Sequence, residues 1–167
     1  MLTLGTVLMT NSDYQTAIHE AAHAVASHLQ EFTLLRVKIE PSRHTGSFLQ
    51  THPGTKAEWA LREMLVYRCG SSAERYILGV ERISGNCHDE SCITTLLSYL
   101  CPPLSATDPD ELWDAHEEAI GLYRTRLDDD AKAFVTKYEG KIRRLADVLC
   151  TKHILSGEEA VAIIDSL

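Results

Sequence analysis

The chain has 167 residues, of which 44% are hydrophobic and 24% are charged, proportions of a globular protein rather than a disordered or fibrous one. Its length predicts a single domain over residues 1–167. The formal net charge of −8 argues against a nucleic-acid backbone or an anionic membrane surface as the main partner, because both would repel the protein.

The apolar stretches and the cysteines together indicate a soluble protein of the cytoplasm. Residues 1–9 are apolar but lack the basic residues of a signal peptide. No later run approaches the roughly 20 apolar residues that a membrane helix needs. The five cysteines include no Cys-x-x-Cys pair, and their odd number favours reduced thiols over a disulfide framework.

The first expected element is a helix over residues 13–30, where apolar residues recur at three- and four-residue spacing. Alternation of apolar and charged residues over 34–40 then predicts a half-buried strand. Its inward residues are expected to be Leu35, Val37 and Ile39. After a turn over 42–45, residues 46–51 are expected to return as a second strand. These segments predict a small antiparallel ribbon.

A second helix is expected over residues 55–78, since apolar residues repeat there every four positions. The repeat consists of Ala57, Leu61, Leu65, Cys69, Ala73 and Ile77, and the stripe is widened by Trp59, Val66 and Tyr76. Gly79 is placed to end this helix, and residues 80–88 have the composition of a loop. A third helix follows, with Asp89 in its first turn and Pro102 beyond its end.

The remaining chain predicts helices over 108–127, 129–138, 141–152 and 157–164. The run Asp128-Asp129-Asp130 is expected at a helix start, because it lacks the alternating spacing and the glycine of a calcium loop. The fold class is therefore mainly α within α+β, a helical bundle that carries one small antiparallel β-ribbon.

The pattern His-Glu-x-x-His lies in the first expected helix, at His19, Glu20 and His23. Residues four apart on a helix lie one turn above each other, so both imidazoles can bind one ion. Zinc accepts two such nitrogens, a third protein ligand and a water, whose pKa it lowers towards neutrality. Glu20 lies about 100 degrees round the helix from His19, close enough to take the proton of that water. The motif predicts Zn²⁺ as cofactor and Glu20 as catalytic base.

The third ligand is left open by the residues themselves, because Ala26 and Leu29 replace the Gly and His of a metzincin-type extension. The candidates are Glu74, Asp89, His88 and Cys87. Glu74 lies on the polar edge of its helix, where a glutamate is more often a solvated charge than a ligand. The ribbon after the motif is suited to binding an extended peptide as an added strand. A chance motif on an exposed helix face is the plain alternative.

Four segments of the chain carry a resemblance to a known family. They are His-Glu-Ala-Ala-His-Ala-Val at 19–25, Cys-Gly-Ser-Ser-Ala-Glu at 69–74, Gly-Asn-Cys-His-Asp at 85–89 and His-Ile-Leu-Ser-Gly-Glu-Glu at 153–159. In sequence and order they resemble segments of the M41 peptidases, the protease domains of membrane-bound AAA proteases of the FtsH type. The corresponding segments of that family are His-Glu-Ala-Gly-His-Ala, Ala-Gly-Arg-x-Ala-Glu, Gly-Ala-Ser-Asn-Asp and Glu-Thr-Leu-x-Gly-Glu-Glu.

The resemblance implies a zincin-like metallopeptidase domain. The zinc ligands that it implies are His19, His23 and Asp89, since the final Asp of the family's third segment is a ligand. Ala22 replaces a glycine of the family and is expected to add a methyl group close to the zinc. Cys87 and His88 replace small or neutral residues beside Asp89, so either is a competing ligand, and His88 is also a candidate partner of the ligands.

No Gly-x-x-x-x-Gly-Lys-Ser/Thr segment occurs, so we expect no ATPase activity of the chain's own through a Walker loop. The family's ATPase ring unfolds and threads substrates, and we expect no membrane anchor of the family's kind in this chain. We therefore expect polypeptide substrates that are short, flexible or already unfolded. A homo-oligomer and a separate ATPase partner are both left open.

The sequence predicts a zinc metalloendopeptidase that hydrolyses peptide bonds in unfolded or flexible polypeptides, with no nucleic-acid or membrane partner. The alternative function is a catalytically inactive binding or regulatory module that keeps the peptidase fold. Four saturated ligands would suit such a module, whereas an open fourth position suits catalysis.

Overall fold

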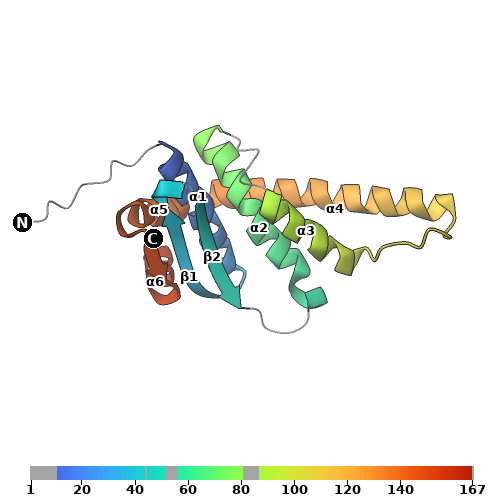
Figure 1. The fold of residues 1–167 in the computed structure, drawn as a ribbon, viewed down its shortest axis with the longest axis horizontal. Helices are drawn as coiled ribbons and strands as arrows, with labels where there is room; N and C mark the ends of the chain where they lie inside the picture. Colours follow the sequence, from blue (N-terminus) through green and yellow to red (C-terminus); the bar gives the residue numbers. More distant parts are fainter. Residues whose placement is uncertain (1–10, 44, 52–55, 81–86, 167) are drawn as a thin grey trace, which may run out of the picture.

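The computed structural model describes residues 11–43, 45–51, 56–80 and 87–166 (Figure 1). The helices are α1 (Asn11–Leu29), α2 (Lys56–Leu78), α3 (Cys87–Leu100), α4 (Asp110–Lys137), α5 (Glu139–Lys152) and α6 (Gly157–Asp165), with a 3-10 turn at Pro41–Arg43. The strands are β1 (Thr33–Glu40), β2 (Thr45–Thr51) and β3 (Ile154–Ser156). The prediction of a mainly helical protein with a small antiparallel sheet is confirmed. The expectations for residues 1–9 and for the loop over 81–86 lie outside the described residues.

The sheet has the strand order β2-β1-β3, and both pairings are antiparallel. Val37 at its centre pairs with Phe48 of β2 on one side and with Leu155 of β3 on the other. The sequence predicted the first two strands but not β3, because three residues are too few to display an alternating pattern. Within the described residues, β2 therefore forms one edge of the sheet.

A β-bulge in β1 changes which residues face the core. The pairing of β1 with β2 shifts between Leu34 and Arg36, and the extra residue reverses the side to which the preceding side chains point. Leu34 is consequently 6% exposed and Leu35 is 43% exposed. The prediction that Leu35 points inward is wrong, whereas Val37 and Ile39 are buried as predicted.

Helix α1 lies behind the sheet and packs against its face and against α2 and α5 (Figure 1). It is buried around most of its circumference, and the buried residues include polar side chains of the His-Glu-x-x-His motif. A helix that is buried on all sides is held by its neighbours rather than by an apolar stripe alone. The motif therefore lies inside the protein and not on an exposed helix face.

The apolar repeat predicted for α2 does not lie on one buried face. Leu61 is 52% exposed, and the buried apolar residues include Trp59, Met64 and Val66 besides Cys69. A residue repeated every four positions advances about 40 degrees round the helix at each step, so a strict four-residue repeat leaves the core face within a few turns. The helix itself ends as predicted at Gly79, which has a positive φ of 69°.

Two predicted helix boundaries are wrong. The helices predicted over 108–127 and 129–138 form the single helix α4 (Asp110–Lys137), and Asp128-Asp129-Asp130 lies inside it rather than at a helix start. Ion pairs offset the acidic charge there, since Asp128 Oδ1 lies 3.1 Å from Arg68 Nε. Cys87 and His88 begin α3 and do not belong to the preceding loop.

Within the described ranges, no helix is both long enough and apolar enough to cross a membrane. All five cysteines are among the described residues, and each is a free thiol.

Gly157 allows α6 to start directly against β1, and its substitution tests this contact. A Cβ at Gly157 would lie 1.7 Å from the Leu34 carbonyl oxygen, a backbone atom that cannot move without distorting the bulge. We expect Gly157→Ala to lower the free energy of unfolding by roughly 1–3 kcal/mol in a denaturant titration.

The matched control is Gly121→Ala in α4, where an added Cβ meets nothing within 4 Å. Gly121→Ala should raise the free energy of unfolding by about 0.5–1 kcal/mol, because alanine has a higher helix propensity than glycine. Equal stability of the two variants would show that the contact between Gly157 and Leu34 does not constrain the fold.

Candidate metal centre

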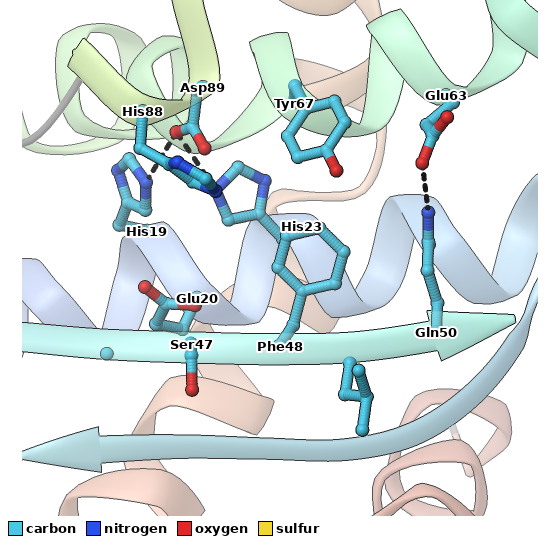
Figure 2. A pocket seen from close by; sticks show the side chains of 12 residues that line it. His19, Glu20, His23, Ser47, Phe48, Gln50, Glu63, Tyr67, His88 and Asp89 are labelled. Atoms are coloured by element: carbon cyan, nitrogen blue, oxygen red, sulfur yellow. Dashed lines mark hydrogen bonds and ion pairs between the residues drawn. The ribbon is translucent and has the colours of Figure 1, made fainter. Parts of the chain in front are cut away.

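The two motif histidines point from α1 towards α2 and α3. Their ring centroids are 4.6 Å apart with an interplanar angle of 82°, as expected for side chains one helical turn apart. Both His19 and His23 are buried. Figure 2 shows the two rings approaching the start of α3, where Asp89 lies.

Asp89 lies between the two imidazoles. Its Oδ2 atom is 3.0 Å from His19 Nε2 and 3.3 Å from His23 Nε2 (Figure 2). One ligand atom from each of the three residues lies within 4.8 Å of the others. The structure thus brings together the three residues predicted as ligands, from two helices that are far apart in the sequence.

The outer nitrogen of each imidazole is fixed by α2. His23 Nδ1 donates a hydrogen bond of 2.8 Å to the Val66 carbonyl oxygen, so Nε2 is the nitrogen that faces Asp89. His19 Nδ1 lies 3.0 Å from Glu74 Oε1, and Gln15 Nε2 donates to the other Glu74 oxygen at 3.1 Å. Such outer partners orient metal-binding histidines and raise their basicity.

The donor set and the space around it fit a metal ion. Ligand atoms about 2.0–2.2 Å from zinc at tetrahedral angles lie about 3.4 Å apart, close to the separations of Asp89 Oδ2 from both Nε2 atoms. Gly70 of α2 borders the same space. A Cβ at Gly70 would lie 2.6 Å from His23 Nε2 and 2.7 Å from His19 Nε2. Any side chain at this position would therefore occupy the region between the donors.

Glu20 lies beside the donor cluster and under β2. A Cβ at Gly46 would lie 2.3 Å from Glu20 Cγ, so the strand can pass over this carboxylate only with glycine there. Among the described residues, the buried atom Glu20 Oε2 has no hydrogen-bond partner. Burial raises the pKa of Glu20 above its usual value, although the neighbouring His23 and His19 oppose this effect. A carboxyl group in this setting is suited to accepting and returning a proton.

The charges of the cluster shift the pKa values of its members in opposite directions. Burial disfavours the charged form of His19, but hydrogen bonds to Asp89 and Glu74 outweigh it and raise the pKa of His19 to about 10. Burial likewise opposes the ionisation of Asp89, but His23 and His19 outweigh it and hold the pKa of Asp89 below its usual range. Without a metal, the cluster is a buried ion pair.

A cavity of about 260 Å³ opens beside the cluster, between β2 and the helices α2 and α3 (Figure 2). It is lined by His19, Glu20, His23, Gly46, Ser47, Phe48, Leu49, Gln50, Glu63, Tyr67, His88 and Asp89. Phe48 forms part of the floor, and its ring stacks on His23 at a centroid distance of 4.7 Å. The open edge of β2 therefore runs past the candidate metal centre.

The other candidate ligands have different positions. Glu74 contacts the outer nitrogen of His19 and not the space between the donors. His88 lines the cavity, and its Nε2 lies 3.7 Å from Cys92 Sγ, whereas Cys87 is exposed and does not line the cavity. Ala22 is buried in the core and does not line the cavity either, so its methyl group does not narrow this space.

Several residues of the site were not predicted from the sequence. Gly70 leaves room for the two imidazoles, the Val66 carbonyl accepts from His23, and Gln15 donates to Glu74. Glu63 and Tyr67 line the cavity. Tyr67 and Glu63 stand four residues apart on α2, and Gly70 and Glu74 continue towards the same side. This row of polar and small residues is the signal in the sequence that indicates the side of α2 facing the site.

Gly70→Ala tests whether the space between the donors holds a metal. The added methyl group should weaken zinc binding by roughly 100-fold or more, since both Nε2 atoms must move to admit it. Competition with a chromophoric chelator measures the affinity, and circular dichroism verifies that the helices remain. Gly121→Ala is the control with no nearby atoms, and an unchanged affinity of Gly70→Ala would place the metal elsewhere.

Zinc binding should also release a proton from His19. The raised pKa keeps the imidazole protonated below about pH 10, and a metal at Nε2 must displace this proton. The apparent affinity of the protein for zinc should therefore rise by about tenfold per pH unit from pH 7 to pH 9. Calorimetry in two buffers of different ionisation enthalpy should give about one proton released per zinc at pH 7.5. A release of zero would contradict the protonated state of His19.

Compared with known proteins, the chain matches no protein-family model and no curated protein. The resemblance to the M41 peptidases consequently depends on the four segments of the sequence.

Proposed function

We propose that the chain is a zinc metalloendopeptidase, an M41-like domain that hydrolyses peptide bonds in unfolded or flexible polypeptides. One observation carries the proposal. Nε2 of His19, Nε2 of His23 and Oδ2 of Asp89 converge beside a cavity that also contains the buried carboxylate of Glu20. Metal donors and a proton acceptor on one side of an open strand are what metal-assisted hydrolysis of a peptide requires.

His19, His23 and Asp89 would hold the ion, and zinc bound there supplies Lewis-acid polarisation and a lowered pKa of water. The protein's own groups set the geometry. Glu74 and the Val66 carbonyl fix the ring orientations from the outer side, so both Nε2 atoms face the same space. Preorganised ligands of this kind need no rearrangement during the reaction.

Glu20 is the proposed proton carrier. Its carboxylate takes a proton from the attacking water, and the same proton passes to the nitrogen of the leaving amine when the peptide bond breaks. Gly46 leaves room for this carboxylate beneath β2, and Oε2 has no partner among the described residues that would compete for the proton. Glu20 thus acts as general base first and general acid second.

β2 is the proposed guide for the substrate. Within the described residues this strand pairs only with β1, and its other edge borders the cavity. An extended peptide can pair with such an edge through its own backbone N–H and C=O groups. The cavity volume of about 260 Å³ admits an extended segment but not a folded domain. This size supports substrates that are flexible or already unfolded.

We further propose that the domain works in the cytoplasm. Its five cysteines are free thiols, as is usual for proteins of a reducing compartment. Cys69 is fully buried, and burial raises the pKa of its thiol, so it is suited to packing rather than to nucleophilic chemistry.

A second candidate function is a binding or regulatory module without turnover, and His88 is the observation that favours it. This histidine lines the cavity beside Asp89, where a fourth protein ligand would saturate the metal (Figure 2). Against this candidate, His88 Nε2 lies near Cys92 Sγ, and the donor cluster of the described residues contains only His19, His23 and Asp89. The peptidase is therefore the better supported function.

Glu20→Gln separates metal binding from catalysis. The amide keeps the shape of the side chain but cannot take a proton, so hydrolysis of a fluorescent unfolded casein should fall by at least about 100-fold. Zinc content per chain, measured by atomic emission, should stay near that of the parent protein. Glu111→Gln on the exposed part of α4 is the matched control and should retain full activity.

Asp89→Ala should behave differently, since it removes a donor and should lower zinc content and hydrolysis together. Retained hydrolysis in a clean preparation of Glu20→Gln would refute the role of Glu20. A parent protein that binds zinc but cleaves nothing would favour the binding module.

A further inference from the structure

A second cavity, of about 310 Å³, lies between α2 and α3. Trp59, Glu63 and Tyr67 of α2 form one wall, and Cys92 and Tyr99 are among the residues of α3 that form the other. Glu63 and Tyr67 line this cavity and the cavity beside the metal centre as well. The two spaces therefore adjoin at these two side chains.

Glu63 places an acidic group at this junction. The residue is only 5% exposed, and its Oε1 accepts a hydrogen bond of 3.3 Å from Gln50 Nε2 of β2 (Figure 2). No lysine or arginine is among the described residues that line the two cavities. A carboxylate in a largely buried position favours the approach of a cation, because burial strengthens their attraction.

Aromatic side chains line the same cavity as this carboxylate. Trp59 and Tyr67 stand one helical turn before and after Glu63 on the same side of α2, and Tyr99 faces them from α3. The faces of Trp and Tyr rings attract cations, and the methylene groups of a long cationic side chain pack well against apolar surface. An acidic group among three aromatic rings is complementary to lysine and arginine rather than to an aliphatic side chain.

The distance from the metal centre fits a side chain of the same substrate. Gly46 packs on Glu20, and Gln50 contacts Glu63. Gln50 follows Gly46 by four residues along β2. An extended strand rises about 3.3 Å per residue, so the two positions are roughly 13 Å apart. A peptide paired with β2 would present to Glu63 a side chain about two to four residues from the bond that is cleaved.

We propose that the cavity between α2 and α3 is a specificity pocket for a lysine or arginine side chain of the substrate, and that Glu63 is its specificity-determining residue. This inference rests on the proposed peptidase function, and it adds a class of substrate: flexible polypeptides that carry a basic residue a few positions from the cleaved bond.

The test uses a set of peptides in which one lysine moves along an otherwise neutral sequence. Each lysine peptide has a partner with norleucine, which has a similar length and no charge. For the zinc-loaded full chain, kcat/KM should favour lysine over norleucine by about tenfold or more at one position, two to four residues from the cleaved bond. In Glu63→Gln this ratio should fall to near one, whereas Glu111→Gln should keep the ratio of the parent protein.

A binding measurement keeps the two proposals separable. Zinc-loaded Glu20→Gln should bind the best lysine peptide more tightly than its norleucine partner by fluorescence anisotropy, and adding Glu63→Gln should abolish the difference. If lysine peptides bind selectively but the parent protein hydrolyses none of them, the proposed peptidase function is refuted and the proposed lysine pocket stands. Equal binding and equal cleavage of lysine and norleucine peptides would overturn the pocket, as would a lysine preference that survives Glu63→Gln.

Discussion

The close approach of α2 to α1 at Gly70 is the constraint on which the rest of the site depends. A hydrogen atom in place of a side chain lets the two imidazoles of α1 turn towards each other beneath α2. The same contact brings the Val66 carbonyl and the Glu74 carboxylate within hydrogen-bond distance of the outer nitrogens. Asp89 at the start of α3 then closes the remaining side. Helix packing thus positions every donor.

The cluster has two ways to balance its buried charge. A buried carboxylate is costly unless a cation or several hydrogen bonds accompany it. In the metal-free protein, the protonated imidazole of His19 lies between Asp89 and Glu74 and provides this cation. A divalent ion bound at Nε2 of His19 would replace the proton on this nitrogen and balance the charge of the same two carboxylates. The helices can therefore stay packed with or without the metal, as expected where the ligands come from helices that already have a core.

Local patterns in the sequence were enough for the motif and for most helices. The spacing of His19 and His23 already implied that both rings lie on one side of a helix, and Asp89 as the third donor came from the resemblance alone. The role of Glu74 could not be deduced, because it depends on the way α2 packs against α1. The bulge at Leu34 was equally hidden, since it arises only when β1 pairs with β2.

The central strand β1 is completed by β3, which comes from a distant part of the sequence. Pairings between distant segments form late, because closing a long loop costs chain entropy before any contact is gained. During synthesis, α1 and β2 are also made well before residues 154–156, which complete the sheet. A nascent chain that ends before these residues has β1 paired on one side only. The sheet is thus completed only once synthesis has passed residues 154–156, although the three candidate donors lie within the first 89 residues.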